Sequence, residues 1–382
     1  MFSSSIISID KDALAHNLKF IRSLIDKNVR FSSVVKGNAY GHGLEAFVAL
    51  ALENDVNHFS VYNADEAYRV KMITQDMADV MIMGYMSDEA LYWAIEEGVS
   101  FYIFSIERLN KTLEIAKMLN KKALIHLEVE TGMNRTGLEV HEFDIALDIL
   151  KKQKEYLYFQ GLCTHFAGAE NIANFVRITE QKRCFYEFKS IAESAGLKPE
   201  FHHTCCSAAA VRFPEMHLDL VRIGIMQFGL WPSKEIFIEY LKDKKFKESP
   251  LKRLLSWKST IMSFKKVDMG EYVGYGSSYL ALKDMTIAIV PIGYAHGFTR
   301  SLSNQGRALV GGQRVPVIGM VNMNCLALNV NDLENLKVGD EVVLIGEQGN
   351  QTISIASFSE ISAQVNYELL TRLPSDIPRI LE

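Results

Sequence analysis

The chain has 382 residues, and at roughly 100 to 200 residues per domain it should form about two domains. Hydrophobic residues make up 48% and charged residues 23%, which excludes a disordered, collagen-like or coiled-coil protein. Lysine and arginine total 41 against 46 aspartate and glutamate, a net charge of −5, and no basic run stands out. The chain therefore lacks the positive surface that binding to nucleic acid or an anionic membrane requires. We expect a small-molecule ligand, with neither nucleic acid nor membrane as a partner.

The five cysteines form no CxxC pair and are too few for a disulfide framework in a chain of this length. The N-terminus has no basic start before its short apolar run, and it meets Asp10 and Lys11 soon afterwards, unlike a signal or transit peptide. No apolar run approaches the length that spans a bilayer. These features predict a cytoplasmic protein with reduced thiols.

Over the first part of the chain, eight short β-rich runs alternate with segments whose apolar residues recur at helical spacing. In the leading helix, for example, Leu14, Leu18 and Ile21 follow this spacing. Eight strands with a helix after most of them are what a closed (β/α)8 barrel requires, and the loops after its strands would then carry the active site. The expected strands are 30–36, 58–62, 79–84, 100–104, 123–129, 156–165, 200–205 and 219–223.

From about Phe237 the chain changes to short strand-like runs separated by turns, and the glycine pair at 311–312 is typical of a two-residue hairpin. The fold class is therefore α/β: an N-terminal (β/α)8 TIM-type barrel over residues 1–236, followed by a mainly β C-terminal domain over 237–382. The first few residues are expected in either domain, and the charged stretch 242–252 is either a linker or a solvated helix. The expected C-terminal strands are 254–264, 285–292, 307–310, 314–321, 326–330 and 341–345.

Lys36 ends the first expected barrel strand, inside the glycine-rich segment VVKGNAYGHG (34–43). A lysine at the end of an apolar strand is about as often a plain surface residue, but the glycines favour a functional site. A partly desolvated lysine at a barrel mouth can lose its proton and form a Schiff base with a carbonyl cofactor, usually pyridoxal 5′-phosphate (PLP).

A phosphorylated cofactor needs an anion site, which barrels commonly build from the loops after strands seven and eight. Ser207 follows the seventh expected strand, and Gly224 and Ile225 follow the eighth. A hydroxyl and backbone N–H groups could therefore converge on a phosphate. For Ser207 taken alone, a helix N-cap is the commoner explanation.

Two other polar residues lie on expected barrel strands. Arg222 sits in the eighth strand, where a buried arginine needs a partner, either a ligand or a carboxylate such as that of Asp219. His165 ends the sixth strand and would face the same barrel mouth, although a lone histidine there is more often a satisfied core residue.

An ordered set of motifs resembles one family, the alanine racemases, which are PLP enzymes with a barrel and a β domain. The resemblance covers nearly the whole chain, and several ordered matches of this length are not expected by chance. The motifs are VVKGNAYGHG (34–43), TGMNRTG (131–137), THFAGAE (164–170), CSAA (206–209), VRIGIMQFGL (221–230), VGYG (273–276), PIGYAHG (291–297) and VNYE (365–368).

The resemblance implies that PLP is the cofactor and that Lys36 binds it covalently. Arg222 would face the pyridine nitrogen and, because arginine does not readily give up a proton, leave that nitrogen unprotonated. This would limit a long-lived carbanion and stray transamination. The implied phosphate ligands are Tyr40, Ser207, Gly224, Ile225 and Tyr367. The implied substrate-carboxylate site consists of Arg135, which would also hold the phenolic oxygen of the cofactor, and the backbone at Met323.

Racemisation removes a proton from one face of a carbon and returns a proton to the opposite face, for which two bases are the simplest solution. The resemblance implies that Lys36 is one base and that Tyr275 of the VGYG motif is the other. Tyr275 would reach the site from the partner subunit of a homodimer with shared sites, and His165 and Arg222 would form its hydrogen-bond chain. Taken alone, Tyr275 would be an aromatic residue in a glycine-rich turn.

Four positions depart from the common family pattern. Glu128 stands where many relatives have a carbamate-modified lysine, and its carboxylate could orient Arg135 without modification. Asn324 replaces an aspartate, Met320 replaces an arginine near the access route of the substrate, and His296 replaces the aspartate of a GYADG motif. Charge is therefore removed near the access route. Alanine stays the leading substrate, with serine, lysine or a broad range of amino acids left open.

The expected function is thus PLP-dependent racemisation of L-alanine and D-alanine, with no metal. Two other classes compete with it. A PLP-homeostasis protein has a similar barrel but lacks the β domain that holds Tyr275. A barrel-type decarboxylase of basic amino acids has both a Lys-bound cofactor and a β domain, but it should lack the VGYG and TGMNRTG signatures.

Overall fold

The structure is a computed structural model that describes residues 3–242, 244–245, 247–355 and 366–382. Its contacts divide the chain into two compact units. The barrel unit comprises Asp12–Lys36 and Phe47–Arg253, and the β unit comprises Met1–Lys11, Gly37–Ala46 and Leu254–Glu382. The domain boundary expected between residues 236 and 237 stays a prediction.

The barrel unit contains one parallel sheet of eight strands in the order β8-β7-β6-β5-β4-β3-β2-β9. Backbone hydrogen bonds also join its two edge strands, from Asp219 N to His202 O at 3.1 Å and from Arg222 N to Cys205 O at 2.9 Å, so the sheet forms a nearly closed barrel. The expected eight-stranded barrel is confirmed. The strands are β2 (Arg30–Val34), β3 (His58–Val61), β4 (Asp79–Ile82), β5 (Ser100–Ile103), β6 (Ala123–Glu128), β7 (Leu157–Cys163), β8 (Phe201–His203) and β9 (Leu220–Ile223).

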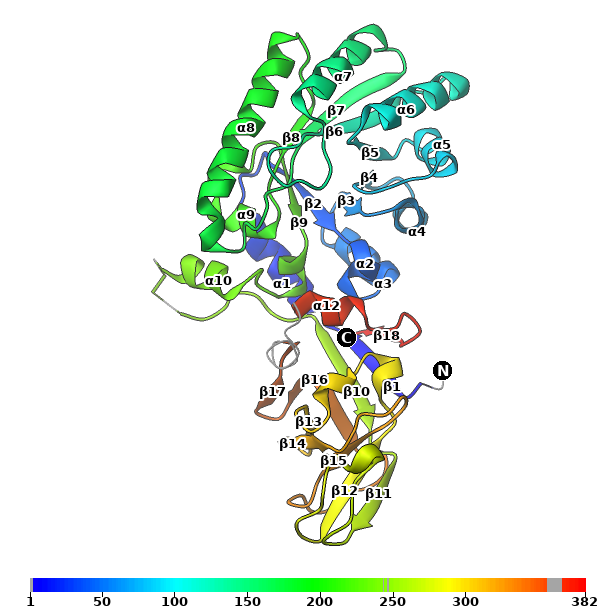
Figure 1. Cartoon of the computed structure of the whole chain (residues 1–382), viewed down its shortest axis with the longest axis vertical. Coiled ribbons are helices and arrows are strands. Elements are labelled where there is room, and N and C mark those ends of the chain that lie inside the picture. The colour runs from blue at the N-terminus through cyan, green and yellow to red at the C-terminus, as the bar shows by residue number, and fades with distance from the viewer. Residues whose placement is uncertain (1–2, 243, 246, 356–365) are drawn as a thin grey trace. The chain divides into compact units, whose positions relative to one another are not determined.

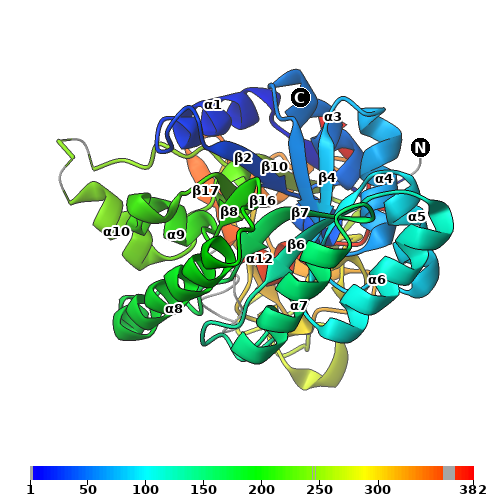
Figure 2. The same cartoon turned by 90° about the horizontal axis from the view of Figure 1, so that it is seen from above.

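Helices follow the strands and lie outside the sheet, as the view from above shows (Figure 2). Side chains such as those of Asn63, Ser87 and Ser105 cap helix starts by accepting a backbone N–H. No helix in the described ranges is long and apolar enough to cross a membrane. The helices are α1 (Lys11–Arg22), α3 (Leu44–Glu53), α4 (Ala64–Thr74), α5 (Asp88–Glu96), α6 (Ile106–Leu119), α7 (Val140–Lys152), α8 (Phe175–Ser194), α9 (Ser207–Arg212) and α10 (Lys234–Leu241), with short 3-10 turns η1 (Ile172–Asn174), η2 (Pro214–Met216) and η3 (Ile225–Phe228). The short element α2 (Lys36–Tyr40) belongs to the β unit from Gly37 onward, and Gly37 to Tyr40 have positive φ.

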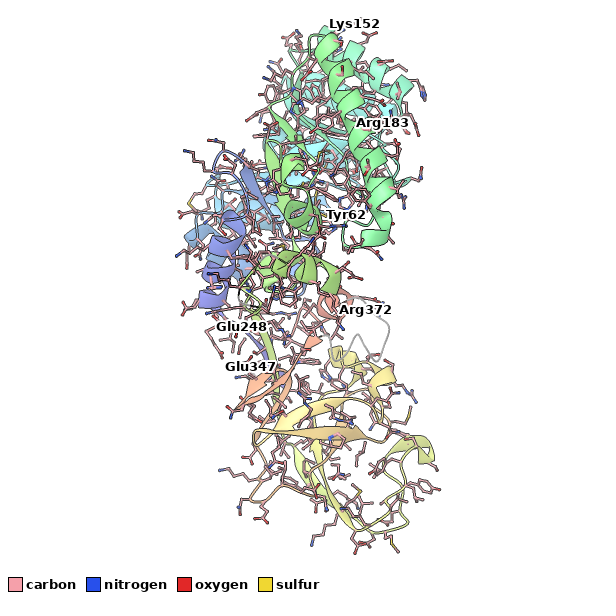
Figure 3. All side chains as sticks on the ribbon, turned by 90° about the vertical axis from the view of Figure 1, so that its left-hand side faces the viewer. Tyr62, Lys152, Arg183, Glu248, Glu347 and Arg372 are labelled. Atoms are coloured by element: carbon pink, nitrogen blue, oxygen red, sulfur yellow. The ribbon has the colours of Figure 1, made fainter. Side chains whose placement is uncertain are left out.

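Helix α8 shows how these helices attach to the sheet. On its exposed side, Arg183, which is labelled in Figure 3, pairs with Glu180 at 2.8 Å and with Glu187 one turn further on. Exposed ion pairs of this kind add little stability, typically below about 1 kcal/mol. On the other side, Phe185 and Phe188 are almost fully buried. Burial of this apolar face therefore holds α8 in place.

The β unit contains a sheet in the order β11-β12-β15-β14-β13-β16-β10-β1-β18, with β17 paired to β16 (Figure 1). Strand β1 pairs with β10, with Ile7 opposite Trp257, so the first residues of the chain complete this sheet. The strands are β1 (Ser5–Ile9), β10 (Leu255–Thr260), β11 (Ser263–Val267), β12 (Met285–Val290), β13 (Arg307–Val310), β14 (Gln313–Ile318), β15 (Leu326–Asn329), β16 (Glu341–Gln348), β17 (Gln351–Ile353) and β18 (Arg379–Leu381). The unit also holds α12 (Asn366–Thr371), η4 (Tyr275–Ser277), η5 (Tyr294–His296) and η6 (Arg300–Leu302).

The expected hairpin at 311–312 is confirmed. Strands β13 and β14 pair antiparallel, with Val310 opposite Gln313. Gly311 and Gly312 between them have φ values of 57° and 75°. Two successive left-handed residues match the right-handed twist of the flanking strands, and glycine adopts this conformation without a steric cost.

We predict that Gly229→Ala destabilises the protein far more than Gly98→Ala, although both glycines have positive φ, of 81° and 66°. A Cβ on Gly229 would lie 1.9 Å from the carbonyl oxygen of Lys252, whereas one on Gly98 would meet nothing within 4 Å. The Lys252 carbonyl cannot easily retreat, because Asn17 Nδ2 donates to it at 2.7 Å. In urea unfolding, we expect the free energy of unfolding to fall by about 1 kcal/mol in Gly98→Ala and by more than about 3 kcal/mol in Gly229→Ala. Equal losses would contradict this packing.

Candidate active site

Lys36 lies directly after β2 and Val35, at the start of α2. The side chain of Lys36 reaches the surface. The protein packed around its amine nevertheless lowers the pKa of that amine. Burial is the largest cause, followed by the positive charge of Arg135. The carboxylate of Glu66 opposes the shift, and Arg222 adds to it. A larger fraction of the Lys36 amine is therefore neutral than for an ordinary lysine.

Arg222 on β9 is 5% exposed and points its guanidinium at acceptors on the neighbouring strand ends. Nη1 contacts His203 Nδ1 and the His203 carbonyl oxygen (3.0 Å), and Nη2 contacts the carbonyl oxygens of Thr164 (2.9 Å) and Thr204 (3.1 Å). The carboxylate considered as its partner from the sequence, that of Asp219, binds the backbone and ring of His202 instead. The fifth donor of Arg222, its Nε–H, has no acceptor among the residues that the structure describes.

His165, just after β7, has a pKa lowered to about 3. Burial is the main cause, and the charges of Arg222, Arg135 and Lys36 add to it, so these four side chains lie within electrostatic reach of one another. Gln181 of α8 fixes the backbone here: its Nε2 donates to the His165 carbonyl at 3.0 Å, and its Oε1 accepts the N–H of Ala167 at 2.8 Å. His165 is thus a neutral imidazole held in a cationic pocket.

Ser207 and Gly224 meet where the seventh and eighth barrel strands end. The Gly224 N–H donates to Ser207 Oγ at 3.0 Å. Ser207 is the first residue of α9 and Ile225 the first residue of η3, and both are buried. The structure therefore brings together a hydroxyl and the starts of two helical turns, as expected from the sequence. Such backbone starts suit an anion.

Glu128 ends β6 and is 4% exposed. Thr136 Oγ1 donates to its Oε2 at 2.8 Å. Burial raises the pKa of Glu128, while the Thr136 hydrogen bond and the charge of Arg135 act against the rise. Within the described ranges, no hydrogen bond or ion pair joins Glu128 to Arg135, so the two interact over a longer distance. The orienting role expected for Glu128 stays a prediction.

In the β unit, Tyr40 and Tyr367 lie together, with ring centroids 6.2 Å apart and an edge-on angle of 78°. The turn that carries Tyr40 is fixed at Gly41. A Cβ there would lie 1.9 Å from the Leu370 carbonyl oxygen, and Arg379 Nη2 donates to the Gly41 carbonyl at 3.0 Å. The two tyrosines expected as phosphate ligands thus come from one well-anchored cluster.

Tyr275 begins η4 in the β unit and is 72% exposed. Asn304 fixes this turn, because its Nδ2 donates to the Ser278 carbonyl at 3.0 Å while its Oδ1 accepts the Gly319 N–H at 2.7 Å. Met323 is also exposed, and its carbonyl accepts the Ala295 N–H at 3.0 Å. Both residues therefore lie at the surface of their unit.

The remaining departures from the family pattern also lie in the β unit. The ring of His296 accepts the Gly293 N–H through Nδ1 at 3.2 Å, so it stabilises its own turn. Met320 is half-buried and Asn324 is exposed. None of the three contributes a carboxylate or a guanidinium to its loop.

Two residues near Lys36 and Arg222 were missed from the sequence. His203 binds Arg222 from inside the barrel, and the available signal was a polar side chain on a strand that is buried on both faces. Glu66 is 8% exposed and raises the pKa of Lys36. Its carboxylate accepts the N–H of Tyr62, labelled in Figure 3, at 2.9 Å. In the sequence it is indistinguishable from other first-turn glutamates.

Comparison with known proteins gives one family. Residues 9–232 match the model for the alanine racemase N-terminal domain, and residues 254–381 match that for the alanine racemase C-terminal domain. An alanine racemase from Leptospira interrogans is 32% identical over 380 residues, which cover 99% of this chain and 96% of that protein.

Solved structures agree. Alanine racemase from Bacillus anthracis with bound L-Ala-P is 31% identical, with a TM-score of 0.90, covering 100% of this chain and 96% of that one. The fold also matches that of alanine racemase from Bartonella henselae with covalently bound pyridoxal phosphate, at 23% identity, a TM-score of 0.85 and full coverage of both chains. Because the two family models together span nearly the whole sequence, this chain belongs to the alanine racemase family.

Proposed function

We propose that this protein interconverts L-alanine and D-alanine with PLP as its cofactor, using Lys36 and Tyr275 as bases for opposite faces of the substrate. The observation that carries the proposal is the lowered pKa of Lys36 in a barrel mouth that also holds Arg222, Arg135 and a neutral His165. Membership of the alanine racemase family supports the same reaction. Relatives solved with L-Ala-P and with pyridoxal phosphate support the substrate class and the cofactor.

The residues of the barrel unit fit PLP. Lys36 offers an amine that is more readily deprotonated than usual, and Ser207 and Gly224 offer a hydroxyl and a helix-start backbone for the phosphate. Arg222 retains its Nε–H for the ring nitrogen. When bound, PLP supplies a carbonyl that bonds to amines and an electron-withdrawing ring that acidifies the α-proton of an amino acid. Ile225, Tyr40 and Tyr367 are proposed as further phosphate ligands.

Lys36 and Tyr275 divide the proton transfers. The lowered pKa increases the fraction of neutral amine, so Lys36 Nζ is proposed to take a proton and give it back on the same face of the substrate. Tyr275 Oη is proposed to do the same on the other face, with His165 as its hydrogen-bonding partner. Arg222, whose N–H donors are assigned to protein acceptors and the ring nitrogen, is proposed to act on this pair through its charge. His165 suits this relay because its low pKa keeps the ring neutral, with one nitrogen free to accept.

Arg135 and the backbone at Met323 are proposed to hold the substrate carboxylate. A guanidinium matches a carboxylate with two parallel hydrogen bonds, which orients the α-carbon as well as binding it. Met320, Asn324 and His296 carry no carboxylate or guanidinium, so they do not narrow the substrate range, and alanine is proposed from the family match.

We infer that the protein acts as a homodimer in which Tyr275 serves the barrel of the partner subunit. The segment around Tyr275 exposes large apolar side chains, among them Met269 (69%), Tyr272 (55%) and Leu282 (81%). Exposed apolar residues gathered in this way favour an interface between proteins.

The five cysteines are all free thiols, which supports a cytoplasmic location.

Borohydride reduction of the purified yellow protein should attach the cofactor irreversibly to Lys36. The lowered pKa of Lys36 makes it the expected nucleophile. Peptide mapping by mass spectrometry locates the label, and Lys36→Ala, checked for folding by circular dichroism, should take up none. A label on a different lysine would overturn the assignment.

Tyr275→Phe should lower the rate of racemisation by roughly 10²- to 10⁴-fold, the usual contribution of a positioned acid or base. Because the substitution keeps the aromatic ring and removes only the hydroxyl group, thermal stability should be nearly unchanged. In deuterated water, Lys36 should still exchange the α-proton of D-alanine with retention of configuration, as followed by proton NMR.

Mixing Tyr275→Phe with Lys36→Ala tests the shared site. If Tyr275 crosses to the partner subunit, each heterodimer contains one site with both native residues and regains activity. Absence of recovery after proven subunit exchange would show that Tyr275 serves its own chain.

Glu128→Gln should raise the KM for alanine by about tenfold, or about 1.4 kcal/mol, by removing a charge near Arg135 while keeping a hydrogen-bond acceptor for Thr136. Steady-state kinetics measure the effect. Thr136→Val is the matched control, because it removes the hydrogen bond and leaves the carboxyl group. An unchanged KM in Glu128→Gln would exclude the orienting role.

A further inference from the structure

Polar side chains cross the interior of the barrel, where apolar residues usually dominate. His126 of β6 and His203 of β8 have no exposed surface, and the guanidinium of Arg222 lies beside them. Burying a polar ring without a hydrogen bond costs roughly 2 to 7 kcal/mol, depending on the reference state. The partners of these rings therefore show what the buried groups hold in place.

The hydrogen bonds of this group run in one direction. A guanidinium donates only, so the contact of Arg222 Nη1 with His203 Nδ1 requires that Nδ1 carry no proton. The proton of a neutral His203 is then on Nε2, which lies 2.8 Å from His126 Nδ1. His126 Nδ1 must accept it, so His126 also holds its proton on Nε2. Arg222 therefore donates to His203, and His203 donates to His126, with both rings neutral.

The surroundings agree with neutral rings. Burial is the main cause that lowers the pKa of His126 to about 3, and it also lowers that of His203, to which Arg222 adds. Tyr102 packs beside both imidazoles, with ring centroids 6.2 Å from His126 and 6.0 Å from His203. No carboxylate forms an ion pair with either ring within the described ranges.

The backbone makes room for His126 in particular. The pairing of β6 with β7 shifts register between Ile125 and His126, so Gln160 becomes an extra residue in a bulge. Gly161 then lies opposite His126, and a Cβ on Gly161 would be 1.9 Å from His126 Nδ1. The Gln160 side chain is close enough to raise the pKa of His126, although no hydrogen bond of normal geometry joins them. A bulge and a glycine thus both serve the placement of this ring.

We propose that His126 is a positioning residue: by accepting the Nε2 proton of His203, it keeps His203 Nδ1 available as the acceptor that fixes the orientation of Arg222. Four terminal N–H bonds of Arg222 are occupied by protein acceptors, so the position of His203 also sets the direction of the remaining Nε–H. The consequence for turnover rests on the proposed function, in which that donor meets the cofactor. The hydrogen-bond chain itself does not depend on the proposed function.

Three substitutions separate hydrogen bonding from space filling. In His126→Asn, the side-chain oxygen can occupy the place of Nδ1, which keeps an acceptor but leaves a void. In His126→Phe, the ring volume is kept but the acceptor is lost. His58→Phe is the matched control, because His58 is equally buried (2% exposed) but bonds Ser32 Oγ at 2.8 Å and not Arg222 or His203.

We expect His126→Phe to lower kcat by about 10- to 100-fold with the KM for alanine within about threefold of the original, since Arg135 is untouched. His126→Asn and His58→Phe should stay within about threefold in kcat. The absorption spectrum of the bound cofactor should become pH-dependent only in His126→Phe, because a misaligned Arg222 no longer keeps the ring nitrogen unprotonated. If the kcat of His126→Phe equals or exceeds that of His126→Asn, the ring of His126 only fills space and the proposal is wrong.

A second measurement needs neither activity nor a variant that folds well. Long-range proton–nitrogen NMR of the purified full-length protein with 15N-labelled histidine distinguishes protonated from bare ring nitrogens. His203 should show a bare Nδ1 and a protonated Nε2 over about pH 6 to 8, the range in which an ordinary histidine titrates. A protonated Nδ1 on His203 would overturn the proposal. If the unaltered protein lacks racemase activity but shows this tautomer, the proposed function is wrong and the hydrogen-bond chain from Arg222 to His126 is still supported.

Discussion

The permanent charge of Arg222, buried in the barrel without a carboxylate partner among the described residues, is the constraint on which the barrel mouth depends. An arginine cannot shed its proton, so its charge must be dispersed over oriented dipoles. The structure provides carbonyl oxygens of Thr164, His203 and Thr204 and one imidazole nitrogen. The same charge contributes to the low pKa values of Lys36 and His165. Together with burial, which is the larger cause, this fixed cation favours the neutral forms of Lys36 and His165.

The sequence predicted much of this arrangement because strand ends are easy to recognise. Lys36, His165 and Ser207 each follow a short β-rich run, and parallel strands in a barrel bring their ends to one face. Their nearness therefore follows from alternation of strands and helices alone. The alternative that Asp219 pairs with Arg222 is wrong, because Asp219 binds His202, and residue types do not reveal when backbone carbonyls serve as partners. The chemical roles of these residues and of Tyr275 came from the family resemblance.

Other features were out of reach because they depend on small shifts in register. A bulge of one residue at Gln160 changes which side chains of β7 face β6, and nothing in the local run of residues marks it. The contacts of His126 and His203 depend on that shift. Glu128 shows a second limit: its direct partner, the hydroxyl of Thr136, was not expected from the sequence, while its orienting role toward Arg135 stays a prediction.

The pairing of β1 with β10 and β18 has a consequence for how the protein is made. Ile7 lies opposite Trp257 of β10 on one side and beside Arg379 of β18 on the other. Strand β1 therefore pairs with strands that are synthesised long after it. This part of the sheet cannot form until β18 has been synthesised, and the large sequence separation of the paired strands favours slow formation relative to local helices. Strands β1 and β18 are parallel neighbours, so a linker from the end of β18 to the start of β1 would have to run back along the length of the pair. New ends opened in an exposed loop would then let the β1 segment emerge together with its partners.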